Sequence, residues 1–148
     1  MKKSSLFILL FSLLFFTACK EPSLGGKVKR EYFTGGKLRS EFFMTDSTEQ
    51  NGLLKKYGYD GKLTSTVSIK NGVKNGTETW FDPKGRVIMR IPYVNGEKQG
   101  IQKAYYPNGD IMISYTYKDN VLNGKATKYN QGGTINKQVI YRNGKLVN

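Results

Sequence analysis

A spacing of 24 residues runs through most of the chain and limits the folds open to it. Glycine recurs at this spacing in two sets, one of which is Gly52, Gly76, Gly100 and Gly124. A column of aromatic residues keeps the same spacing, at Tyr57, Phe81, Tyr105 and Tyr129. Such a period is typical of an array in which each unit packs on its neighbours. We therefore predict a repeat domain over 27–148 with five tandem units, the first of them imperfect, near 27–51, 52–75, 76–99, 100–123 and 124–147.

Each unit carries two turn signals, represented by Asp60-Gly61 and Asn71-Gly72. Such dipeptides tolerate positive φ in tight hairpins. The stretches between them, such as 86–93, alternate with a period of two and are rich in β-branched and aromatic residues, as strands are. Turns this short do not allow parallel crossovers. The sequence thus predicts an all-β fold, an elongated single-layer antiparallel β-meander of about ten strands, two in each unit.

The same alternation gives the sheet one apolar, aromatic face and one largely polar face. The apolar face is expected to carry columns such as Val67, Ile91, Tyr115 and Val139. The glycine set that contains Gly100 either lets an aromatic ring lie across the backbone or meets a turn requirement, and the sequence leaves both explanations open. Pro92 falls inside a strand and lacks an N–H, so it should lie beside an edge, a bulge or an irregular stretch.

The motif Gly-x₄-Tyr-Tyr-Pro-Asn-Gly-Asp-Ile, which begins at Gly100, and the run from Tyr93 to Gly100 resemble MORN repeats. They are most similar to the MORN variant of bacterial proteins often labelled YwqK-family antitoxins. The resemblance covers about 27–148 and implies stacked β-hairpins in one long curved sheet. For function it implies a scaffold or partner-binding surface, since MORN arrays serve as both, and some eukaryotic members are proposed to bind phospholipid. The antitoxin label implies a cognate toxin.

Residues 1–18 have the features of an export signal: a basic start, an apolar run of about 11 residues and then small residues. The run is shorter than the roughly 20 residues that span a membrane. The sequence Phe16-Thr17-Ala18-Cys19 resembles the bacterial lipobox, which implies that Cys19 carries diacylglycerol and further acylation such as palmitate. Residues 19–26 then form the lipid anchor and a tether. Lys20 stands where Asp would retain an enterobacterial lipoprotein at the inner membrane, so we predict a lipid-anchored protein of the bacterial cell envelope, with the outer membrane favoured in Gram-negative cells.

The composition argues against catalysis. The chain has no histidine, one cysteine and eleven scattered acidic residues, so we expect no catalytic residues, no metal site and no cofactor. The formal charge is +13. Basic residues near an anchored surface can attract anionic lipid headgroups or envelope polymers, although dispersed charges also suit a simply solvated surface. We do not expect an exported protein to bind nucleic acid.

A candidate partner-binding surface follows from the strand alternation. If Phe81 and Tyr105 face the apolar side, residues beside them should point outward, giving a surface of Trp80, Arg86, Ile88, Arg90, Tyr106 and Met112. Aromatic residues, Met and Arg are enriched in protein interfaces. The alternative is that these rings cover exposed backbone or a second apolar strip. We expect a membrane-anchored, non-catalytic protein-interaction or scaffold module; the alternatives are an antitoxin or immunity protein and a binder of anionic lipid or envelope polymer.

Overall fold

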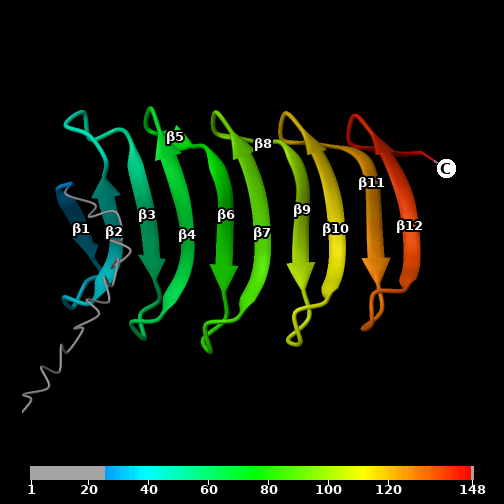
Figure 1. Ribbon diagram of the computed structural model, residues 1–148, viewed down its shortest axis with the longest axis horizontal. Helices are drawn as coiled ribbons and strands as arrows, with labels where there is room; N and C mark the ends of the chain where they lie inside the picture. The colour runs from blue at the N-terminus through cyan, green and yellow to red at the C-terminus, as the bar shows by residue number, and fades with distance from the viewer. Residues whose placement is uncertain (1–25, 148) are drawn as a thin grey trace, which may run out of the picture.

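A computed structural model describes residues 26–147, whose regular structure is entirely β. Thirteen antiparallel strands form one single-layer sheet, in which strands lie side by side in chain order except that the short β5 and β8 pair only with β4 and β7 (Figure 1). This confirms the predicted all-β meander. The strands are β1 (Val28–Tyr32), β2 (Leu38–Met44), β3 (Gly52–Tyr57), β4 (Leu63–Lys70), β5 (Val73–Lys74), β6 (Gly76–Phe81), β7 (Val87–Val94), β8 (Glu97–Lys98), β9 (Gly100–Tyr105), β10 (Ile111–Lys118), β11 (Val121–Tyr129), β12 (Ile135–Arg142) and β13 (Lys145–Val147).

The predicted signal segment 1–18 and Cys19 lie outside the described residues, as does most of the predicted tether. Within 26–147, the structure contains no helix with the length and apolarity needed to cross a membrane.

The strand count exceeds ten because two strands are interrupted and β13 adds a short eleventh strand to the sheet path. The interruptions fall at Asn75, between β5 and β6, and at Gln99, between β8 and β9. At the second one the Gln99 N–H donates to the Pro92 carbonyl at 3.1 Å. Pro92 therefore lies opposite an irregular stretch, where its missing N–H is tolerated.

Three glycines of the 24-residue spacing are required by backbone conformation. Gly76, Gly100 and Gly124 have φ values of 118°, 101° and 125°, which side-chain-bearing residues rarely adopt. The nearest atoms to a Cβ added at these positions belong to Ser68, Pro92 and Thr116, none of them aromatic. At Gly52 the added Cβ would instead collide with the Phe43 backbone carbonyl oxygen and would also lie 2.9 Å from the Phe42 ring. Backbone conformation thus explains three of the four glycines, and a close backbone oxygen together with the Phe42 ring restricts Gly52.

The hairpin turns at the unit boundaries follow the sequence signals. Asn71 and Gly72 both have positive φ, as do the equivalent pairs Asn95-Gly96 and Asn143-Gly144. Positive φ at both central residues defines the type I′ turn, whose twist matches that of the strands it joins. The same conformation occurs at Asp119-Asn120, where the second residue is not glycine.

Most of the small core lies on one side of the sheet, which we call the packed face. Its buried apolar residues are Met44, Val67, Ile91 and Ala126. Pairing places Leu54 opposite Val67, and Ala126 between Tyr115 and Val139, as the predicted apolar columns require. The packed face also buries polar side chains, among them Ser65 and Glu78. The opposite side, which we call the open face, carries pairs such as Thr79 with Arg90 and Lys103 with Ser114.

The predicted outward orientation of Trp80 is wrong. Trp80 pairs with Ser65 on one side and with Met89 on the other, which places it on the packed face beside Glu78 and Ile91. The register shifts between Trp80 and Phe81. Because the alternation of faces is interrupted at such an irregularity, the inward position of Phe81 does not send Trp80 outward.

Replacing Trp80 by alanine should lower the free energy of unfolding by about 2–4 kcal/mol, because it empties a position of the packed face. Trp80→Phe should cost about 1 kcal/mol or less. The indole Nε1 of Trp80 is buried and has no hydrogen-bond partner among the described residues, so replacement by phenylalanine removes an unsatisfied donor. Urea unfolding followed by circular dichroism measures both changes. Wild-type stability of Trp80→Ala would contradict the packed-face position.

A polar network crosses the first strands of the sheet. The Tyr57 hydroxyl donates to Glu41 Oε2 at 2.7 Å, and Arg30 Nε donates to Glu41 Oε1 at 3.0 Å. Burial, together with the adjacent Glu41 carboxylate, raises the pKa of Tyr57 from 10.0 to about 12. The hydrogen bond from Tyr57 is the largest influence on Glu41 and lowers the pKa of that carboxyl.

The Tyr57 shift predicts an alkaline loss of stability. A group whose pKa is raised by folding contributes stability below its unfolded pKa of 10.0, and this contribution disappears as pH rises through about 12. The ¹³Cζ chemical shift of Tyr57 should show a titration midpoint near 12. Glu41→Gln should move that midpoint toward 10, since it removes the neighbouring charge. An unchanged midpoint in Glu41→Gln would contradict the proposed cause.

Candidate functional site

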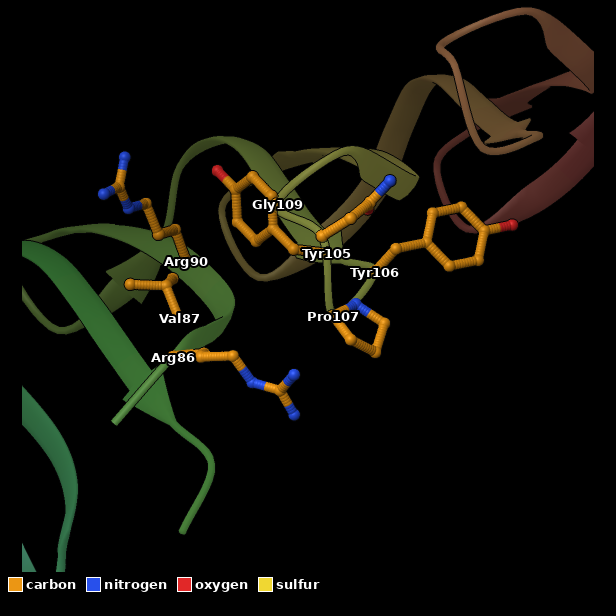
Figure 2. A pocket seen from close by; sticks show the side chains of 8 residues that line it. Arg86, Val87, Arg90, Tyr105, Tyr106, Pro107 and Gly109 are labelled. Atoms are coloured by element: carbon orange, nitrogen blue, oxygen red, sulfur yellow. The ribbon is translucent and has the colours of Figure 1, made fainter. Parts of the chain in front are cut away.

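An open cleft of about 430 Å³ lies where the start of β7 meets the end of β9 and the turn that follows it. Figure 2 shows Arg86 and Arg90 on one side of this cleft and Tyr105 and Pro107 on the other. The lining residues are Arg86, Val87, Arg90, Tyr105, Tyr106, Pro107, Asn108 and Gly109. Two neighbouring repeat units build it, so the tandem arrangement itself creates the concavity.

Arg86 is held in place by the turn that precedes it. Its Nε lies 2.7 Å and its Nη2 lies 2.6 Å from Asp82 Oδ2, and its backbone N–H donates to Asp82 Oδ1 at 2.9 Å. That backbone hydrogen bond is the largest cause of the lowered pKa of Asp82. Much of the Arg86 charge is therefore neutralised locally, and Arg86 provides a fixed wall of the cleft.

Arg90 is in a different situation. Its guanidinium carbon lies 5.9 Å from the centroid of the Tyr105 ring, a cation–π distance. Among the ion pairs formed within 26–147, none involves Arg90. Its side chain is on the open face, and the residue is exposed. Arg90 thus offers a positive charge over an aromatic ring to an incoming group, and both Arg and Tyr are enriched among the residues that contribute most to binding at protein interfaces.

The structure brings together half of the predicted surface residues. Arg86, Arg90 and Tyr106 line the cleft. Ile88 is 39% exposed but does not line it. Met112 falls in the register shift between Ile111 and Ile113. Trp80 belongs to the packed face, as described above.

Tyr106 has a structural role as well as a place at the cleft. Its hydroxyl donates to the Tyr129 carbonyl at 2.8 Å, which links the turns of two adjacent units. In Figure 2 its ring accordingly points away from the two arginines. Tyr106 therefore borders the cleft, but its hydrogen bond to the next unit fixes the position of its ring.

Sequence reasoning missed the other side of the cleft. Tyr105 was expected to face the apolar side, yet its ring contributes to the lining, and the turn residues Pro107 to Gly109 complete it. The Pro-Asn-Gly turn could have indicated this side of the cleft, because it follows Tyr105 and Tyr106 directly and so places the turn backbone close to a tyrosine ring. No group of three or more His, Cys, Asp or Glu suited to holding a metal ion occurs in the described part of the chain.

Comparison with known proteins bears on the same region. The profile of the MORN repeat variant family matches residues 74–95 and 98–119. The cleft lies between these two matched stretches, with lining residues from each of them. No curated protein matches the sequence. Most of the third and fourth units therefore matches the MORN repeat variant.

Proposed function

We propose that this chain is a non-catalytic interaction module of the bacterial cell envelope, held at the membrane by a lipid on Cys19. MORN repeats suggest protein interaction, and the observation that carries the proposal is Arg90. It lies exposed above Tyr105 at a cleft between two such repeats, without an ion pair inside 26–147. An acidic or aromatic side chain of a partner protein would find a charged and an apolar contact there.

The one-layer sheet supports the same role. Large apolar side chains remain exposed along its length, including Ile101 at 53%, Val94 at 49% and Val121 at 43%. A single sheet with no second layer in the described residues offers two broad surfaces for binding, and repeat arrays commonly use such extended surfaces.

The anchor rests on the sequence that precedes the sheet. The lipobox-like Phe16-Thr17-Ala18-Cys19 follows an apolar export signal, and two or more acyl chains give stable membrane attachment. Cells grown with a palmitate analogue should label the wild-type protein and leave Cys19→Ala unlabelled. Label that persists in Cys19→Ala would refute the anchor without affecting the interaction role.

The interaction role is tested by affinity capture from detergent-solubilised membranes with a carboxy-terminal tag. A specific partner should be recovered with the wild type and reduced about tenfold with Arg90→Glu, because this change reverses the free charge at the cleft. Lys70→Glu is the matched control, since it makes the same charge change at an exposed residue of β4. Equal recovery by the two variants would contradict the proposal. If the specific partner is a toxin, the protein acts as an immunity protein.

A further inference from the structure

The last long strand, β12, has an outer edge that is paired over less than half of its length. On its inner side β12 pairs with β11 from Ile135 to Tyr141. On its outer side β13 covers Ile140, Tyr141 and Arg142. Over Ile135–Val139 this edge has no strand partner among the described residues. Unpaired N–H and C=O groups along such an edge form a template for another extended segment.

The sheet itself shows how a strand docks at this position. One and two units earlier, the residues equivalent to Lys137 are Ile113 and Met89. Met89 receives Ala104 of the next unit, and Ile113 receives Lys128 of the next unit. The Lys137 position therefore has the backbone geometry that the inner units use to accept their neighbours.

The charge around this edge selects the chemistry of an occupant. The sequence contains no Asp or Glu after Asp119, while five basic residues follow it: Lys125, Lys128, Lys137, Arg142 and Lys145. Lys128 and Lys137 are exposed and lie directly opposite one another on β11 and β12. Like charges in this position repel each other. An acidic side chain on an added strand, placed beside Lys137 in the same row, would relieve that repulsion.

The neighbouring row is apolar. Val139 lies in line with Ala126 and Tyr115 on the packed face. A shallow cavity of about 270 Å³ extends beside it and includes Tyr141 and Leu146 in its lining. A strand added to β12 would place side chains two residues apart beside Lys137 and beside Val139, because alternate residues share a face.

We propose that the outer edge of β12 binds an extended acidic segment of a partner protein as an added antiparallel strand. The segment carries an apolar residue beside Val139 and, two residues later, an acidic residue beside Lys137. Backbone hydrogen bonds to the edge supply affinity, and these two side chains supply specificity. A second copy of this chain, docked through the same edge, fits poorly, because its Lys128 and Lys137 would add two positive charges to a pair that already lacks an acidic neighbour. The inference rests on the proposed interaction role and names a partner class and a second surface for it.

The experiment measures binding of a blocked fluorescent peptide, which repeats valine, threonine, glutamate and threonine, to the full chain in detergent. Fluorescence anisotropy should show saturable binding that weakens about tenfold with Lys137→Glu, as expected for reversal of one exposed charge. Lys70→Glu, the same change on β4, should leave the affinity unaltered. The same peptide with methylated amide nitrogens should lose binding, because it cannot donate to the edge.

Three results would overturn the proposal. Equal affinity of the methylated peptide would mean charge attraction without strand addition. Equal affinity of Lys137→Glu and Lys70→Glu would remove the edge as the site. Dimers in sedimentation that Lys137→Glu dissociates would make a second copy the occupant. Arg90→Glu should bind the peptide normally, so peptide binding can succeed or fail independently of partner capture at the cleft.

Discussion

Replacing Lys74 by methionine is expected to lower the free energy of unfolding by about 2–4 kcal/mol. The Glu78 side chain is 2% exposed, and its Oε2 lies 2.7 Å from Lys74 Nζ, the only cation within ion-pair distance of it in the described residues. Methionine keeps the apolar stem of Lys74 and removes the charge. It would leave a carboxylate buried without a compensating cation, which is among the most destabilising single changes. Urea denaturation measures the loss.

The next repeat unit supplies the matched control. Lys98 and Tyr117 reproduce the positions of Lys74 and Tyr93, with the lysine Nζ 4.9 Å and 4.6 Å from the respective ring centroids. In this later unit, however, Gln102 occupies the position equivalent to Glu78. Glu78→Gln should therefore cost about 1 kcal/mol or less, and the double variant Lys74→Met with Glu78→Gln should recover most of the lost stability. A double variant no more stable than Lys74→Met alone would contradict the charge argument.

The second large effect is expected at Gly124. Its φ of 125° lies in a region that side-chain-bearing residues rarely adopt, and an added Cβ would lie 2.9 Å from Thr116 Cβ. Thr116 cannot easily move, since its hydroxyl donates to the Lys125 carbonyl at 2.9 Å. Backbone strain and overpacking then add, so Gly124→Ala should lower the free energy of unfolding by about 2–4 kcal/mol.

Gly133 separates the two contributions. It has a φ of 85°, but nothing lies within 4 Å of an added Cβ. Gly133→Ala should therefore cost about 1 kcal/mol, from backbone conformation alone. Thermal unfolding of the two variants side by side measures the difference. Equal losses would show that contact with Thr116 contributes nothing.

The repeat period made most of the fold predictable. Turn dipeptides such as Asn71-Gly72 and the alternation within β7 and β10 are local signals, and they identified strands, turns and the antiparallel order. In the apolar column, Val67 and Ile91 are likewise buried as expected, and Tyr115 and Val139 are half-buried. These features depend on neighbouring residues and on a period that the chain repeats, so a single sequence carries enough information to find them.

The parts that were not predictable depend on register and on non-local partners. The shift between Trp80 and Phe81 reversed the expected face of Trp80. Equivalent shifts precede Tyr57 and Tyr129, but they become visible only in the strand pairing. Burial of Glu78 depends on Lys74 folding over it across the β5–β6 interruption. Predicting that Arg90 lies over Tyr105 of the next unit requires knowing how far adjacent units are offset along the strands. Residue columns alone do not give that offset.

Site-specific photo-crosslinking can show whether the surface around Arg90 binds a partner protein, as we propose. A photoreactive phenylalanine analogue is placed at Ile88, which is 39% exposed and lies two residues from Arg90. The control position is Tyr59, 58% exposed in the turn after β3. In intact cells, irradiation should link one discrete protein to the Ile88 variant and not to the Tyr59 variant, and adding Arg90→Glu should abolish that product. Crosslinks of equal yield from both positions, or a product that survives Arg90→Glu, would mean that the surface around Arg90 is not the binding site.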